Sequence, residues 1–105
     1  MKLNSSFRDG RLTLSLSGEL DHHAAREAMQ RIGREIDLNL PRECVLDLDK
    51  LTFTDSSGIA VILGTQKRMG QVEGKLLVIN VHKQPMKVFK AAGIGRITEI
   101  QEVAG

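Results

Sequence analysis

The amino-acid sequence predicts an α/β domain in which helices pack on a mixed β-sheet, with elements in the order ββαβαβα(β). Three observations lead to this prediction: a hairpin signal near the amino terminus, apolar residues at helical spacing, and short apolar runs between the expected helices. The 105 residues can bury one core, and the chain has no linker, repeat or low-complexity segment. We therefore expect residues 1–105 to form a single domain.

The composition excludes several classes of function. Hydrophobic residues make up 41% and charged residues 27%, as in soluble globular domains rather than collagen-like or disordered chains. No apolar run is long enough to span a membrane and no signal-peptide pattern opens the chain, so we expect a cytoplasmic protein without a membrane partner. The formal net charge is only +2, and Trp and Tyr are absent, so we expect no direct binding to nucleic acid. The small size favours a binding or regulatory module over an enzyme.

The first element is a β-hairpin predicted over residues 2–17. Asp9-Gly10 is typical of a type I′ turn, which needs positive φ at both central positions. In the return strand three leucines alternate with Thr and Ser, which predicts one buried face and one face not covered by helices. Residues 18–21 are expected to break this strand.

A first helix is predicted after Asp21, whose carboxylate can accept hydrogen bonds from N–H groups at the helix start. Asn39 and Pro41 are expected to end it. Its core positions recur at helical spacing and are Ala25, Ala28, Met29, Ile32 and Ile36.

A strand follows over residues 44–48, in which Cys44 is expected to be a buried residue rather than a redox thiol. This lone cysteine excludes an internal disulfide and a cysteine-based zinc finger.

The second half of the chain repeats the strand–helix pattern. A polar connection is expected to lead into a second helix over residues 57–70, with Gly70 as its C-cap. The core side of this helix is expected to carry Ile59, Ile62, Leu63 and Met69. Residues 76–81 are apolar on both faces, which predicts a central strand. A third helix is predicted over residues 84–92 and a short last strand over residues 97–100.

The most informative segment for function is the strand end at residues 46–48 together with residues 53–59, where Asp55, Ser56, Ser57 and Gly58 lead into the second helix. Ligands of open α/β sheets bind beyond the carboxyl ends of strands, and a helix start attracts anions, so a phosphate on a serine would be tolerated here. Gly58 would leave room for another protein's backbone. The same residues also fit an ordinary cap, in which Asp55 or Ser56 accepts the hydrogen bond and Ser57 is merely solvated.

Catalytic and metal-binding chemistry is not expected. Neither Ser56 nor Ser57 stands in the Gly-x-Ser-x-Gly pattern of a nucleophile elbow. His22 and His23 are adjacent on a predicted helix and would point about 100° apart, so they do not form a chelating face and are expected at the surface or against a partner. Residues 70–76 resemble a phosphate loop but lack its Ser or Thr and precede a strand. We therefore expect no catalytic residue, no metal and no cofactor.

Two motifs support a resemblance to a known family. They are Gly-Glu-Leu-Asp-His-His-Ala at residues 18–24 and the segment at residues 55–64, which begins with Asp-Ser-Ser-Gly. With both motifs, the chain resembles the anti-sigma factor antagonists of the STAS family from about residue 3 to residue 100. The first motif is most similar to the sporulation branch, which controls sigma-F. The resemblance implies a STAS-like domain.

The resemblance also implies a partner-switching cycle. The unphosphorylated antagonist binds an anti-sigma factor that is a serine kinase, and so frees the sigma factor. The kinase phosphorylates one serine and releases the antagonist, and a PP2C-type phosphatase restores the serine. In the family this serine is the second of the pair, which falls on Ser57. Asp21 and Asp55 match the family's flanking acidic residues.

We expect the kinase to dock on the turn at residues 21–24 and on the first half of the second helix, because Ser57 must enter its active site. Gly58, Val61 and Thr65 are expected to project outward there, and an exposed Val61 would indicate an interface. The expected partner-binding residues are Asp21, His22, His23, Asp55, Ser56, Gly58, Val61 and Thr65.

Other functions are open on the sequence alone. They are an antagonist of the general stress-response pathway, a non-switching STAS binding module such as the cytoplasmic part of a transporter, and a small enzyme that uses the same loop. The chain also departs from the resemblance after its last predicted strand. Similar proteins usually carry a further helix there, whereas only five residues follow Ile100. We expect this to affect the packing of that edge and not the switch site.

Overall fold

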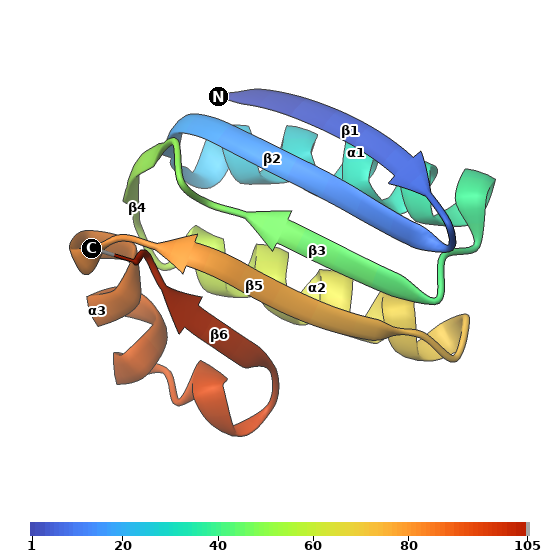
Figure 1. Cartoon of the computed structure of the whole chain (residues 1–105). Helices are drawn as coiled ribbons and strands as arrows, with labels where there is room; N and C mark the ends of the chain where they lie inside the picture. Colours follow the sequence, from blue (N-terminus) through green and yellow to red (C-terminus); the bar gives the residue numbers. More distant parts are fainter. Residues whose placement is uncertain (105) are drawn as a thin grey trace.

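A computed structural model describes residues 1–104, which form a six-stranded β-sheet and three α-helices (Figure 1). In chain order the elements are β1 (Lys2–Arg8), β2 (Arg11–Leu20), α1 (His22–Asn39), β3 (Glu43–Asp47), β4 (Leu51–Thr54), α2 (Ser57–Gln71), β5 (Lys75–Val81), α3 (Lys83–Ala91), a 3-10 helix (Ile94–Arg96) and β6 (Glu99–Glu102). The predicted fold class is confirmed, and β4 is an additional short strand.

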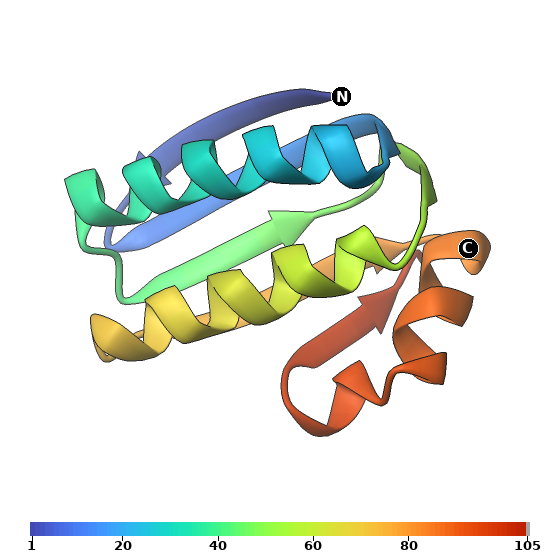
Figure 2. The ribbon, with the colours of Figure 1, turned by 180° about the vertical axis from the view of Figure 1, so that it is seen from behind.

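The sheet is mixed, with the strand order β1-β2-β3-β5-β6 and β4 paired separately with β2. β1 and β2 are antiparallel, and the other pairs are parallel. Helices α1 and α2 lie side by side on one face of the sheet (Figure 2). Among the described residues no helix covers the other face, as predicted from the polar face of β2 (Figure 1). The carboxyl ends of β2, β3 and β5 therefore meet at one edge, where α1, β4 and α3 follow.

The hairpin turn is confirmed. Asp9 and Gly10 have φ of 52° and 81°, as a type I′ turn requires. The predicted break at residues 18–21 is wrong, because β2 continues to Leu20. Gly18 has a φ of 94°, and the pairing shifts between Gly18 and Glu19, so that β2 pairs first with β3 and then with β4. The glycine bends the strand toward a new partner instead of ending it.

The sequence does not predict β4, because its four residues show no clear periodicity of apolar side chains. Leu51 and Thr54 are buried, and the two residues between them are exposed. This pattern lacks the alternation of buried and exposed residues that indicates a strand. The segment predicted as a polar connection is therefore a strand that extends the sheet toward the start of α2.

The core lies between the sheet and the two helices. It contains the predicted leucines of β2 and the predicted α1 residues Ala25, Ala28, Ile32 and Ile36, whereas Met29 is only partly buried. In α2 the prediction was partly wrong. Ile62 and Met69 are buried, Ile59 is partly buried, and Leu63 is 39% exposed.

Several element ends also differ from the prediction. α2 continues through Gly70 to Gln71, and the left-handed position after it belongs to Glu73, with a φ of 58°. β5 is an interior strand between β3 and β6, but Leu77 and Ile79 are only half-buried because no helix covers their face. β6 begins two residues later than predicted, after the 3-10 helix.

None of the helices in the described part of the chain has both the length and the apolar character needed to cross a membrane.

Candidate functional site

Ser57 is the first residue of α2, and the side chain that caps this helix belongs to Asp55. The Asp55 Oδ1 atom accepts a hydrogen bond from the Ser57 N–H at 2.7 Å, and its carbonyl accepts from the Gly58 N–H at 3.1 Å. Ser56 makes no side-chain cap bond and is exposed. Of the two caps that the sequence allowed, the structure selects Asp55. Ser57, partly exposed, is left at the positive end of the helix dipole.

Asp21 lies beside this site. Its Oδ1 atom accepts from the Ala24 N–H at 2.8 Å, so the predicted cap of α1 is confirmed. Leu20, the residue before it, pairs with Thr54 of β4, and the Asp55 N–H donates to the Leu20 carbonyl at 3.4 Å. The two aspartates thus follow directly on paired residues of neighbouring parallel strands. The structure brings together both motifs that the sequence analysis singled out.

His22 and His23 are exposed at the start of α1, on the same edge. Within residues 1–104 there is no group of three or more His, Cys, Asp or Glu side chains that could hold a metal ion. Both histidines directly follow Asp21 in the chain.

Gly58, Val61 and Thr65 do not project outward, so the expectation that they form an exposed partner-binding face is wrong. All three are buried, and with Ile62 and Met69 they form the core stripe of α2 at three- and four-residue spacing. The Thr65 hydroxyl donates to the Val61 carbonyl at 2.7 Å, so its polarity is satisfied inside the helix. Two of the five buried positions are Gly and Thr. Because neither residue type is strongly apolar, the pattern of apolar residues in the sequence does not reveal the buried side of α2.

The space beside Gly58 is filled by Thr54. A Cβ atom at position 58 would clash with Thr54 Oγ1, and the Thr54 side chain is fully buried. Gly58 is therefore needed for close packing of α2 on β4, and the expected gap for a partner's backbone does not exist. The residues exposed near Ser57 are Ser56, just before α2, and Ala60 and Leu63 of α2, which sequence reasoning did not place at the surface as a group.

A further residue, Gln84 of α3, contacts the segment that leads to Ser57. The Thr54 N–H donates to Gln84 Oε1 at 2.9 Å, and Gln84 Nε2 donates to the Thr54 carbonyl at 2.8 Å. The residues are 30 positions apart, and no motif or spacing signals their contact in the sequence. Sequence reasoning missed Gln84.

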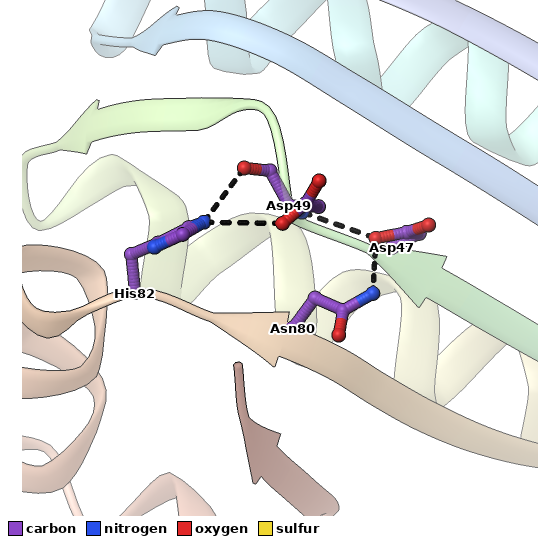
Figure 3. Close-up of polar contacts among 4 residues, drawn as sticks. All are labelled: Asp47, Asp49, Asn80 and His82. Carbon is purple, nitrogen blue, oxygen red and sulfur yellow. Dashed lines mark hydrogen bonds and ion pairs between the residues drawn. The ribbon is translucent and has the colours of Figure 1, made fainter. Parts of the chain in front are cut away.

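Figure 3 shows a polar group at the same edge of the sheet, where β3 and β5 end. Asp47 Oδ1 accepts from Asn80 Nδ2 and from the Asp49 N–H, both at 3.0 Å. His82 Nε2 lies 2.7 Å from the Asp49 carbonyl and 3.3 Å from its carboxylate. These contacts join the β3–β4 connection to the β5–α3 connection.

Cys44 lies at the amino end of β3, away from this edge, and is buried as predicted. Burial raises the pKa of its thiol to about 12, and the charge of Glu43 adds to the rise. The thiol is thus protonated at neutral pH and poorly suited to nucleophilic or redox chemistry.

The STAS domain model matches residues 2–104, and the chain belongs to the STAS domain family. An anti-sigma F factor antagonist of Paenibacillus polymyxa is 31% identical over 102 residues, which cover 97% of this chain and 87% of that protein. One from Lysinibacillus sphaericus is 32% identical over 84 residues, which cover 80% and 72%. An anti-sigma-B factor antagonist of Listeria monocytogenes is 23% identical over 97 residues, which cover 90% and 82%.

Solved structures share the fold. The unphosphorylated anti-sigma factor antagonist SpoIIAA matches with a TM-score of 0.73 at 21% identity, covering 99% of this chain and 90% of that chain. The phosphorylated form of the Bacillus cell fate determinant SpoIIAA matches with the same TM-score at 26% identity, covering 94% and 90%.

Proposed function

We propose that this chain is an anti-sigma factor antagonist that is switched off by phosphorylation of Ser57. The observation that carries the proposal is the position of Ser57 at the partly exposed start of α2, next to Asp55 and Asp21. Membership of the STAS family and the names of the relatives support it. In its unphosphorylated form the chain binds an anti-sigma factor with serine kinase activity in the cytoplasm, and the sigma factor is freed.

The switch itself is electrostatic. The kinase transfers the γ-phosphate of ATP to Ser57 Oγ, the hydroxyl proton is lost, and ADP is released. The phosphate adds about −1.5 to −2 charges at pH 7. At the helix start this charge is tolerated, because the dipole attracts it by about 0.3–1 kcal/mol. In an interface it would lie beside Asp55 and Asp21, so it would be buried against like charges and the complex would dissociate. A PP2C-type phosphatase then removes the phosphate. The chain itself carries out no catalysis.

The sigma-F pathway is the proposed setting. The relatives named anti-sigma F factor antagonists are 31% and 32% identical to this chain, whereas those named anti-sigma-B factor antagonists are 20–23% identical. An antagonist of the general stress response is the alternative. Binding assays against purified anti-sigma kinases of both types discriminate between them, because tighter binding to the sigma-B type would favour the alternative.

Tandem mass spectrometry after incubation with the kinase and ATP tests the modified residue. We expect one phosphate per chain, on Ser57, because its hydroxyl stands at the start of α2 in the second position of the motif. Phosphate mainly on Ser56, or on a hairpin serine such as Ser15, would contradict the assignment. A chain that binds no anti-sigma factor and accepts no phosphate would contradict the proposed function as a whole.

The docking surface follows from the exposed residues around Ser57. We propose that it consists of Asp21 with the first residues of α1, His22 and His23, and of Ser56 with the outer side of α2, Ala60 and Leu63. Leu63 is a large apolar side chain at 39% exposure, which fits a protein contact.

Leu63→Glu should weaken kinase binding at least tenfold, because a carboxylate would replace an apolar contact. Leu38→Glu is the matched control, since Leu38 is also an exposed helical leucine but lies in the last turn of α1, at the far end of the molecule. Calorimetric titration measures both affinities, and thermal unfolding checks that both variants fold. Equal affinities for the two variants would place the kinase elsewhere.

A further inference from the structure

Among residues 1–104, β4 pairs with a single strand. It pairs with β2, and the backbone groups of Thr54 point away from that strand toward α3. The side-chain amide of Gln84 meets both groups, accepting from the Thr54 N–H at 2.9 Å and donating to the Thr54 carbonyl at 2.8 Å. A glutamine amide carries a donor and an acceptor in one plane, as a peptide group does. Gln84 thus takes the place of the next strand at this single residue.

Thr54 transmits this contact to the start of α2. Its side chain is fully buried, and Gly58 packs directly on it. Its hydroxyl lies 3.0 Å from the Asp55 carbonyl and 3.2 Å from the Leu20 carbonyl, and either oxygen can accept its proton. Asp55 is the next residue, and its carboxylate accepts a hydrogen bond from the Ser57 N–H. A shift of Thr54 would therefore move the cap of α2 and, with it, Ser57.

A second contact from the same corner holds the segment before β4. His82, two residues before Gln84, bonds through Nε2 to the Asp49 carbonyl at 2.7 Å (Figure 3). His82, just before α3, thus fixes the connection into β4 at Asp49, and Gln84, in the first turn of α3, fixes the end of β4 at Thr54. Both contacts come from outside the two motifs that define the site.

We propose that Gln84 is a positioning residue for Ser57, whose side-chain amide sets the backbone of Thr54 and Asp55 so that Ser57 is presented correctly to the kinase. The proposal rests on the proposed function and deepens it, because it adds α3 to the elements that determine phosphorylation. Gln84 acts through Thr54 and does not have to touch the kinase. Its loss should therefore slow phosphate transfer more than it weakens docking.

Gln84→Met keeps the length of the side chain and removes both hydrogen bonds. With this full-length variant as substrate of the kinase, we expect kcat for phosphorylation of Ser57 to fall about tenfold or more while KM changes less than threefold. Gln84→Glu can still accept from the Thr54 N–H but cannot donate to its carbonyl, so its kcat should lie between those of Gln84→Met and the parent. In the free chain, amide hydrogen exchange at Thr54 and Ser57 should be at least tenfold faster in Gln84→Met.

Gln66→Met is the matched control. Gln66 is also half-buried and also joins distant segments, because its side chain accepts from Thr98 Oγ1 at 3.0 Å and donates to the Ile97 carbonyl. It lies on α2 nine residues beyond Ser57, and its substitution should leave kcat and the Ser57 exchange rate near the parent values. Thermal unfolding of both variants measures the loss of stability that they share.

Parent-like kcat and exchange in Gln84→Met would overturn the proposal, as would an equal fall of kcat in Gln66→Met. If the parent itself is not phosphorylated, the proposed function fails, and the exchange rates still decide the positioning role because they require no partner. Faster exchange at Ser57 in Gln84→Met alone would then support it, and unchanged exchange would overturn it.

Discussion

Ser57→Asp should lower the affinity for the anti-sigma kinase by about 10²- to 10³-fold and leave the fold nearly intact. The new carboxylate lies at the start of α2, where the helix dipole favours a negative charge in the free chain. In the complex it would be buried beside Asp55 and Asp21 without a cation, which costs several kcal/mol. A carboxylate carries less charge than a phosphate, so the phosphorylated chain should bind at least as weakly. Calorimetric titration with the kinase and ADP measures the change.

Two variants serve as controls for this experiment. Ser57→Ala should bind like the parent but should not be released when ATP is added, since it has no hydroxyl to accept phosphate. Ser6→Asp adds the same charge to an exposed position of β1, and its affinity should not change. If Ser57→Asp bound as tightly as Ser6→Asp, local charge at the start of α2 would not be the switch.

The features that the sequence predicts well depend on a few neighbouring residues. Asp9 and Gly10 form the expected turn because positive φ at both positions is a local requirement that Gly meets freely and Asp tolerates. Asp21 caps α1 because its carboxylate needs only an N–H three residues ahead. The fold class follows from the order of such local elements, and the position of Ser57 at a helix start follows from the same chemistry.

The features that the sequence does not predict depend on contacts between distant segments. The core stripe of α2 runs through Gly58 and Thr65, and neither residue type signals burial. Gly58 is buried because it must approach Thr54, and Thr65 because its hydroxyl bonds within the helix. The Gln84 contact spans 30 residues, and only the finished fold brings it together with Thr54. The residues that the sequence analysis expected to be exposed on α2 therefore lie on its buried side.

Substituting two glycines of α2 by alanine measures how much the close packing of Gly58 against Thr54 contributes to the free energy of unfolding. Gly58→Ala should destabilise the protein by about 1–3 kcal/mol, because its methyl group would clash with the buried Thr54 Oγ1, which lies within hydrogen-bond distance of the Leu20 and Asp55 carbonyls. Gly70→Ala is the matched control in the same helix, because its new Cβ would meet no atom within 4 Å beyond its own chain neighbours and the nearby helix backbone. It should stabilise the protein by about 0.5–1 kcal/mol, because Ala loses less backbone entropy than Gly. Urea denaturation measures both changes, which are expected to have opposite signs.

A double-mutant cycle identifies the cause of the Gly58→Ala effect. Thr54→Ala removes the hydroxyl that the new methyl group would meet, so Gly58→Ala made in that background should cost much less than in the parent. The same clash would displace the backbone that leads to Asp55, and Gly58→Ala should therefore also slow phosphorylation of Ser57. If Gly58→Ala were as stable as Gly70→Ala, Thr54 would be free to move aside. The packing of α2 on β4 would then not be what fixes Ser57 at the edge of the sheet.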